Sequence, residues 1–295
     1  MSTQDTTTPK LIELLDLAGD PEARTDEDIF VGHTPPQARN RVFGGQVLGQ
    51  AVMAASKTMA EERPIHSMHG YFLRAGDASL PITFGVQRLR DGRSFSARRV
   101  HAYQNGVPIL SMIASFQAHS EGLDHQDAMP EGVPDPESLP TTAELIGDLD
   151  HPVAKEYAFE RPFDIRYISE PLFLKGPANR PATNAVWMKT NSAMPDDDAM
   201  HRAALAYASD YTLLEPVLRR HGLTWITRGM SVASLDHAMW WHRPFRVDEW
   251  LLYVQESPSA SGARGLATGR IFNRAGDLVA TVAQEGMIRL PRDED

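Results

Sequence analysis

The stretch Met200-His-Arg-Ala-Ala-Leu-Ala-Tyr-Ala-Ser-Asp-Tyr-Thr-Leu-Leu214 decides how the rest of the chain can fold. Its spacing predicts a helix that is apolar on nearly every side, and such a helix is normally buried. Asp210 lies within it and shares a helical face with Tyr207 and Leu214. A buried carboxylate is costly unless it is paired or hydrogen-bonded. Asp210 is therefore either a structural ion-pair partner or a catalytic group.

Stretches of sequence with the pattern of β-strands occur on both sides of this helix, and they divide the chain into two similar halves. In the first half, a short run and a second apolar helix within residues 41–56 precede four long runs, at 65–74, 81–89, 94–103 and 107–117. Asn105-Gly106 between the last two runs is a strong hairpin signal. In the second half, two runs precede the Met200–Leu214 helix and four more come after it, at 230–241, 249–256, 262–273 and 278–289.

The repeated pattern predicts a duplicated α+β fold. Ser96-Ala97-Arg98 resembles Gly262-Ala263-Arg264, and Gly49-Gln50-Ala51 is placed in the first helix where Ser209-Asp210-Tyr211 is placed in the second. A helix that is apolar all round needs a sheet that wraps it, which describes a hot-dog fold, here twice in one chain. The predicted division is a hot-dog domain at 1–120, a Pro-rich acidic linker at 121–152, and a second hot-dog domain at 153–295.

Composition excludes several classes of function. The net charge is −10 without a basic run, so nucleic acid is not an expected partner. No cysteine is present, which removes disulfides, thiolate metal sites and cysteine nucleophiles and suits a reducing cytoplasm. The start of the chain has no apolar signal region, and no run of 18 apolar residues predicts a membrane span. We therefore expect a cytoplasmic protein.

Two other motifs are interpreted as structural. Gly44, Gly45 and Gly49 match neither the dinucleotide nor the Walker spacing, so they predict close packing of their helix against a surrounding sheet rather than a nucleotide cofactor. His66 and His69, like His237 and His242, lie at odd spacing and point to opposite faces of a strand, which argues against a shared metal. No G-x-S-x-G motif is present, which disfavours an α/β-hydrolase serine nucleophile.

Two polar residues interrupt predicted core faces of the second half. Gln284 shares a strand face with the apolar or small residues Ala280, Val282, Gly286 and Ile288. Ser234 shares a face with Val232, Asp236, Ala238 and Trp240. Gln284 is either a core amide that satisfies backbone groups or a functional residue, and Ser234 is either a small strand residue or a functional one. With Asp210 they form a convergent polar set.

Several segments resemble the acyl-CoA thioesterase II family, a double hot-dog group. The likeness runs from about residue 40 to 290, and its motif with the most specific pattern is Leu235-Asp-His-Ala-Met-Trp-Trp-His-Arg-Pro-Phe245. The other segments are Val42-Phe-Gly-Gly-Gln-Val-Leu-Gly-Gln50, Tyr71-Phe-Leu-Arg74, Ser94-Phe-Ser-Ala-Arg-Arg99, Ala208-Ser-Asp210, Asp248-Glu-Trp-Leu-Leu-Tyr253, Ser259-Ala-Ser-Gly-Ala-Arg-Gly265 and Gln284-Glu-Gly286.

The resemblance implies hydrolysis of medium- and long-chain fatty acyl-CoA to free acid and CoA, without a cofactor, by a water that an Asp, Thr/Ser and Gln set activates. These positions are Asp210, Ser234 and Gln284, and Ser234 stands where the family pattern usually has Thr. The resemblance also implies a homodimer or homotetramer. Because Gln50 takes the place of the acid in the first half, one active centre per chain is expected.

Some interpretations remain open beside this one. Arg98, Arg99 and Arg264 either contact CoA phosphates or are solvent-facing strand charges. The chain could also be a non-catalytic acyl-CoA-binding sensor, or a hot-dog hydratase of enoyl thioesters. Hydratase chemistry usually pairs the Asp with a nearby His, and the sequence neighbours of Asp210 offer only His201 and His221.

Overall fold

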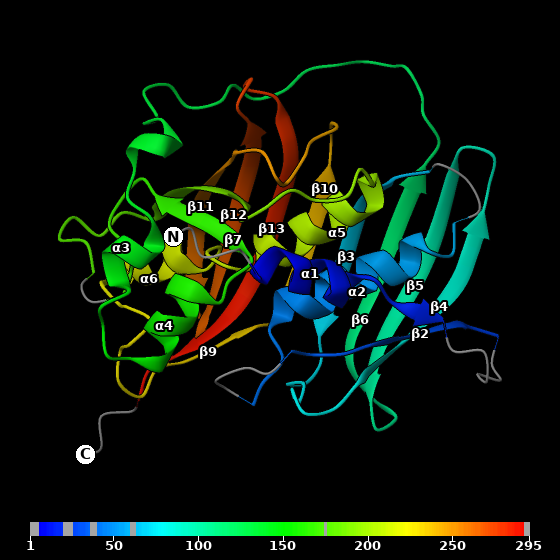
Figure 1. Cartoon of the computed structure of the whole chain (residues 1–295), viewed down its shortest axis with the longest axis horizontal. Coiled ribbons are helices and arrows are strands. Elements are labelled where there is room, and N and C mark those ends of the chain that lie inside the picture. The colour runs from blue at the N-terminus through cyan, green and yellow to red at the C-terminus, as the bar shows by residue number, and fades with distance from the viewer. Residues whose placement is uncertain (1–5, 20–25, 36–39, 60–62, 174–175, 292–295) are drawn as a thin grey trace.

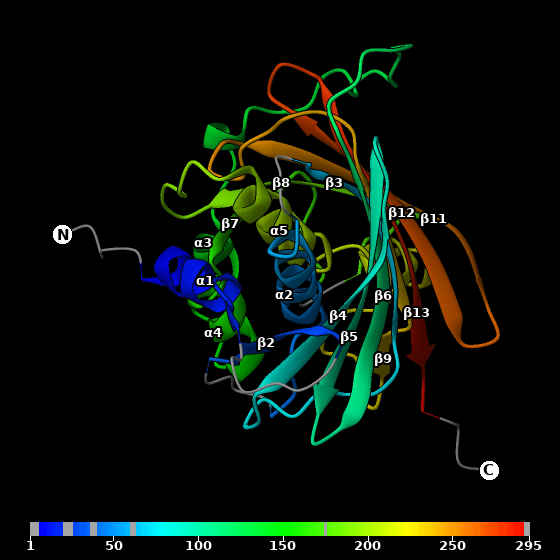
Figure 2. The same ribbon diagram turned by 90° about the vertical axis from the view of Figure 1, so that its right-hand side faces the viewer.

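The computed structural model describes residues 6–19, 26–35, 40–59, 63–173 and 176–291. In this part of the chain, an antiparallel sheet of thirteen strands curves around two central helices (Figures 1 and 2). The first-half strands are β1 (Ala18–Gly19), β2 (Asp28–Gly32), β3 (Ile65–Phe72), β4 (Ile82–Asp91), β5 (Phe95–Gln104) and β6 (Val107–Gln117). The second-half strands are β7 (Phe163–Tyr167), β8 (Thr183–Thr190), β9 (Ser231–Ser234), β10 (Asp236–Trp241), β11 (Leu251–Ser261), β12 (Arg264–Asn273) and β13 (Leu278–Arg289).

The strand order is symmetric about the middle of the sheet. It runs β1-β2-β4-β5-β6-β3-β10-β13-β12-β11-β8-β7, with β9 paired to β13 off this path. Each half therefore has the same internal order, and the halves join where β3 pairs with β10, with Met68 opposite Met239. This topology confirms the predicted double hot-dog, because one hot-dog repeat occurs twice in a single sheet.

The two pairs of similar tripeptides in the sequence do not occupy equivalent positions in the two repeats. Ser96 and Ala97 lie inside β5, whereas Gly262 and Ala263 form the turn before β12 with φ angles of 56° and 59°. Gln50 lies in the middle of its helix, whereas Asp210 comes directly after the last residue of another. The duplication is therefore carried by strand order, and these similarities were wrong as evidence for it.

Six helices accompany the described strands, together with a short 3-10 turn at Pro136–Ser138. They are α1 (Thr7–Leu15), α2 (Gly44–Ser56), α3 (Thr142–Ile146), α4 (Pro152–Phe159), α5 (Asp198–Ser209) and α6 (Glu215–His221). None of them is long and apolar enough to cross a membrane. In Figure 2, α2 and α5 lie side by side within the curve of the sheet, and the two helices pack directly against each other.

The predicted helix at 200–214 is wrong at both ends. Its first turn begins at Asp198, because Asp197 precedes it and its side chain accepts hydrogen bonds from the N–H groups of Ala199 and Met200. It ends at Ser209. Pro216 has no N–H to continue the helix, so it lies instead in the first turn of α6, where that N–H is not needed.

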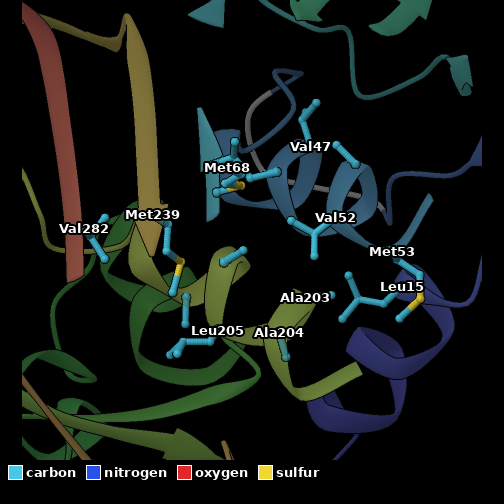
Figure 3. Packing of buried hydrophobic residues seen from close by; sticks show 14 of the residues in the cluster. Leu15, Val47, Val52, Met53, Met68, Ala203, Ala204, Leu205, Met239 and Val282 are labelled. Atoms are coloured by element: carbon cyan, nitrogen blue, oxygen red, sulfur yellow. The ribbon is translucent and has the colours of Figure 1, made fainter. Parts of the chain in front are cut away.

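One continuous hydrophobic core joins the two halves. Figure 3 shows side chains of α2, α5 and the neighbouring strands meeting there, among them Val47, Val52, Ala203, Leu205, Met68, Met239 and Val282. Asn105 and Gly106 form the predicted hairpin turn between β5 and β6 with φ angles of 51° and 75°, as a two-residue turn of this type requires. That prediction is confirmed.

The segment predicted as a linker packs on the outer side of the second half. The Trp187 indole N–H donates to the carbonyl of Pro134 (2.9 Å), and the Trp250 indole N–H donates to Glu137 (3.0 Å). The segment also contains α3, which could not be predicted from the sequence because five residues give too short a periodic pattern.

Gly45 and Gly49 of α2 pack against a helix rather than against the sheet, which corrects the predicted partner for these two glycines, whereas Gly44 lies beside the ring of Phe72 at the end of β3. A Cβ at Gly45 would lie 2.2 Å from the carbonyl oxygen of Tyr207, and one at Gly49 would lie 2.9 Å from that of Ala203. Both contacts are with the α5 backbone, which cannot turn aside as a side chain can. The two central helices therefore approach each other more closely than any residue with a Cβ would allow.

We predict that Gly49→Ala destabilises the fold by about 1–3 kcal/mol, since the added methyl overpacks the α2–α5 contact and outweighs the usual gain of alanine in a helix. Urea unfolding measures the change. Gly122→Ala is the control, because a Cβ there meets nothing within 4 Å. A stabilised Gly49→Ala variant would contradict the close approach.

Candidate active site

Asp210 faces a cavity of about 1200 Å³ that is bounded by segments of both halves. Ser234 also lines this cavity, whereas Gln284 lies behind it. The cavity walls include the aromatic side chains of Phe43, Phe72, Tyr207, Tyr211 and Trp225. The site is therefore a cavity with a mixed lining, in which aromatic side chains lie beside the carboxylate of Asp210 and could receive the apolar part of a ligand.

The carboxylate of Asp210 accepts three hydrogen bonds. Its Oδ1 accepts from Gln284 Nε2 (2.9 Å) and from the Ser234 hydroxyl (3.2 Å). Its Oδ2 accepts from the backbone N–H of Gly45 (2.9 Å). Gln284 Nε2 also donates to Ser234 Oγ (2.6 Å), so the three side chains form a closed triangle. The structure thus brings together the three residues that the sequence singled out.

The donor from Gly45 belongs to the first half of the chain. Gly45 lies in the first turn of α2, whose N–H groups have no partner within the helix. The partial positive charge at this helix end favours a nearby carboxylate. The second half supplies the acid and its two side-chain donors, so the site is complete only where the halves meet.

A β-bulge directs Ser234 into the site. Ser234 lies opposite Gly286, whereas Ala238 lies opposite Ala283, so the stretch between them has one more residue on its own side than on β13. The extra residue is Leu235, whose N–H donates to the carbonyl of Glu285 (2.9 Å). Ser234 therefore shares the buried face with Gln284, and its predicted grouping with Asp236, Ala238 and Trp240 was wrong.

The predicted inward face of β13 is confirmed for Gln284, whose side chain is only 1% exposed. Alternate residues from Ala280 to Gly286 are buried, and Glu285 lies on the other face. A strand that keeps its register keeps its alternation, which is why this face was predictable. The buried face of the neighbouring strand could not be predicted in this way, because the bulge at Leu235 shifts its alternation.

His237 is a functional neighbour that the sequence analysis missed. It is fully buried, and its Nδ1 lies 2.9 Å from Gln284 Oε1 while its Nε2 lies 2.9 Å from Ser209 Oγ. An amide oxygen can only accept, so Nδ1 carries the proton and Nε2 is an acceptor that faces the Ser209 hydroxyl, whose one proton it shares with the carbonyl of Ala206. This bond fixes the amide of Gln284 with its NH₂ group toward Asp210 and Ser234. The available signal was its place in the Asp236-His237 pair, two residues after Leu235.

Burial sets the charge of both titrating groups. Burial raises the pKa of Asp210 to about 6, although Gln284, Ser234 and Gly45 each work to lower it. Burial lowers the pKa of His237 to about 4, against the bond to Gln284, so this imidazole is neutral at pH 7. Asp210 is thus a carboxylate near neutrality with a raised affinity for a proton.

The three arginines considered for CoA phosphates lie outside this cluster. Arg98 is buried and donates to Thr58 and Asp91, among other groups, so its guanidinium is engaged within the protein. Arg99 donates to Gln87 (3.3 Å), and Arg264 pairs with Glu285 (3.0 Å) on the surface. None of the three lines the cavity that Asp210 faces.

Gln50, which was expected to replace the acid in the first half, has a structural role. It is fully buried, and its amide donates to the carbonyls of Leu14 (2.9 Å) and His33 (3.3 Å). Over the described residues, no group of three or more His, Asp or Glu side chains is placed to hold a metal ion.

A carboxylate that follows α5, a hydroxyl from β9 and an amide from β13 converge at the wall of an aromatic-lined cavity. They define a hydrolase-like site on a double hot-dog protein. Comparisons with known proteins agree. The family profile described as "Acyl-CoA thioesterase" matches residues 157–287, and that of the "Acyl-CoA thioesterase N-terminal domain" matches residues 31–117.

Individual relatives support the same assignment. Acyl-CoA thioesterase 2 of Haemophilus influenzae is 39% identical over 284 residues, 95% of this chain and 96% of the relative. The crystal structure of acyl-CoA thioesterase II TesB2 from Mycobacterium marinum is 41% identical, covers 97% of this chain and 99% of its own, and superposes with a TM-score of 0.77. A hot-dog protein of Alicyclobacillus acidocaldarius shares the fold at 19% identity, with a TM-score of 0.76 and coverage of 96% and 98%. The chain belongs to the acyl-CoA thioesterase family.

We predict that His237→Leu raises the pKa of Asp210 above about 6, because the freed amide of Gln284 no longer holds its donor toward the carboxylate. Carbon-13 NMR of labelled aspartate carboxyls through a pH titration measures this value. His237→Asn, which keeps a donor near the Nδ1 position, should show a smaller rise. His242→Leu is the control, since His242 contacts Thr281 on the surface. An unchanged pKa in His237→Leu would contradict the role in orienting Gln284.

Proposed function

We propose that this chain hydrolyses medium- and long-chain fatty acyl-CoA to free acid and CoA, with Asp210, Ser234 and Gln284 as the catalytic set. The observation that carries the proposal is the closed triangle of these side chains at the wall of the aromatic cavity. The volume of that cavity, about 1200 Å³, supports a long apolar acyl group as its occupant.

The chemistry suits a water nucleophile. A thioester carbonyl has little resonance stabilisation and thiolate is a good leaving group, so a positioned water, a base and a stabilised oxyanion suffice. The water attacks the carbonyl carbon and gives its proton to Asp210. The tetrahedral intermediate then expels the CoA thiolate, which takes a proton from Asp210 or from solvent. A base with a pKa of about 6 is well matched to this work near neutral pH.

Ser234 and Gln284 hold Asp210 in place, because the hydroxyl of Ser234 and the amide of Gln284 both donate to its carboxylate. Ser234 Oγ lines the cavity beside Asp210 and keeps a lone pair that accepts from the attacking water. The start of α2 supplies the group proposed for the oxyanion. The N–H of Gly45 is already taken by Asp210 Oδ2, and Gly44 lies beside the same oxygen, since a Cβ there would be 2.8 Å from it. The N–H of Gly44 is therefore the donor that we propose for the developing negative charge.

Contacts of the site disfavour the alternatives. A hydratase of the kind considered would pair the acid with a histidine, but His237 contacts Gln284 and Ser209 rather than Asp210. A sensor that had lost the reaction would have no need to keep three polar side chains converging at the cavity wall at a cost in burial.

We also propose that the protein is cytoplasmic and forms a homodimer or homotetramer. The exposed side chains of Tyr71 and Ile113 lie on two adjacent strands near the middle of the sheet, β3 and β6, and support an interface between copies there. The division into residues 1–120, 121–152 and 153–295 remains a proposal, which the two profile matches support.

Asp210→Asn is expected to lower kcat by about 10²–10⁴-fold while the protein stays folded, because an amide cannot take the proton of the water. Release of CoA thiol from a chain-length series of acyl-CoAs measures kcat, and circular dichroism monitors the fold. Asp198→Asn is the control, since Asp198 pairs with Arg202 outside the cavity. Near-normal turnover by Asp210→Asn would refute the assignment.

The pH profile should show an acidic limb near pH 6, below which kcat falls about tenfold per pH unit as Asp210 becomes protonated. Ser234→Ala removes a donor that lowers the pKa of Asp210, so its limb should move to higher pH. Ser234→Thr keeps the hydroxyl and should retain the wild-type limb. If the midpoint of this acidic limb were the same in Ser234→Ala as in the wild type, the hydroxyl of Ser234 would have no effect on the pKa of the titrating group.

A further inference from the structure

Arg161 is one of several charged residues that line the cavity, and the proposed reaction does not use it. It lies between α4 and β7, and its side chain is 9% exposed. Its guanidinium carbon lies 3.4 Å from the ring centroid of Tyr157 and 4.2 Å from that of Tyr211. Two aromatic faces therefore hold the planar group in one orientation.

The guanidinium has no hydrogen-bond acceptor or anionic partner among the residues that the structure describes. Glu215, the buried acid nearby, already accepts from Tyr167 and Trp225 and pairs with Arg219. Four sealed polar atoms without a partner occur in the described part of the chain, and none belongs to Arg161. Its nitrogens therefore open onto the cavity.

An open, unpaired guanidinium at this depth is unusual, because a buried charge is costly without a partner. Burial lowers the pKa of Arg161, but the phenols of Tyr157 and Tyr211 and the carboxylate of Glu215 raise it above its ordinary value, so the group is charged. Glu156 and Glu160 also line the cavity, so the attraction for an anion is local to the guanidinium. The other described basic side chains of the lining, Lys10, Arg41 and Arg74, are exposed, whereas Arg161 is buried.

We propose that Arg161 is an oxyanion-binding site for a carboxylate or phosphate group of the substrate. The proposal rests on the proposed function and adds to it a contact away from the thioester. The planar guanidinium presents paired N–H donors that match two oxygens of either group. Tyr211, which packs on Arg161, is the residue after Asp210 in the chain and stacks on Phe43 at a centroid distance of 5.0 Å. The rings of Tyr211 and Phe43 thus form one continuous wall between Arg161 and the Asp210 cluster.

The two sources of the oxyanion can be separated with three substrates that share one thioester. Octanoyl-CoA carries phosphates only, ω-carboxyoctanoyl-CoA carries phosphates and a distal carboxylate, and octanoyl-pantetheine carries neither. The variants are Arg161→Met, which keeps an apolar chain between the two rings, and Arg161→Lys, which keeps the charge without the planar guanidinium. Arg88→Met is the control, because Arg88 pairs with Asp28 on an exposed strand.

If Arg161 binds a CoA phosphate, Arg161→Met should raise KM roughly 10- to 100-fold for both CoA substrates and leave octanoyl-pantetheine unchanged. If it binds a carboxylate of the acyl group, only ω-carboxyoctanoyl-CoA should be affected. In both cases kcat should change little and Arg161→Lys should recover part of the loss. An equal effect on all three substrates, or no effect on any, would overturn the proposal.

Calorimetric titration with free CoA and with suberate separates this proposal from the proposed function. Binding to the wild type that is lost in Arg161→Met would support the oxyanion site even if no thioester were hydrolysed, and only the hydrolase assignment would then fail. Hydrolysis by the wild type with identical kinetics and binding in Arg161→Met would leave the hydrolase intact and refute the site.

Discussion

The structure depends on how the Asp210 carboxylate is accommodated at the edge of a hydrophobic core. Removing this charge from water is unfavourable, and three hydrogen bonds from Gly45, Ser234 and Gln284 compensate only in part, as its pKa of about 6 shows. The residual cost leaves a carboxylate that takes up a proton more readily than one in water. The same burial that weakens the fold locally therefore creates the basicity that the proposed hydrolysis requires.

Each of those donors reaches Asp210 through a local feature of its own. Gly45 reaches Asp210 because α2 and α5 touch backbone to backbone, and Ser234 reaches it because Leu235 is an extra residue in its strand. Gln284 comes from a regular strand, but its amide is oriented by the buried imidazole of His237. Regular helices and strands form the walls of the cavity, whereas local features of the chain orient the three donors toward Asp210.

Features that arise from regular periodicity could be predicted from the sequence, whereas features that arise from an interruption of that periodicity could not. The strand runs, the Asn105-Gly106 turn and the inward face of Gln284 rest on local patterns, so they were predictable. The bulge at Leu235 reverses a face without any residue type that marks it, and α5 ends at Ser209 without a glycine or proline at that place. His237 acts through a residue of another strand, and such pairing is visible only once the register is known.

The pairing of β3 with β10 has a consequence for how such a chain can evolve. Because one hydrophobic core and one polar cluster span the two repeats, a gene broken between them would encode two polypeptides that must find each other to work. Selection then acts on the fused pair as a unit, and each repeat is released from keeping a complete centre of its own. In this chain the first repeat contributes the start of α2 to the polar cluster, whereas Asp210, Ser234 and Gln284 all come from the second.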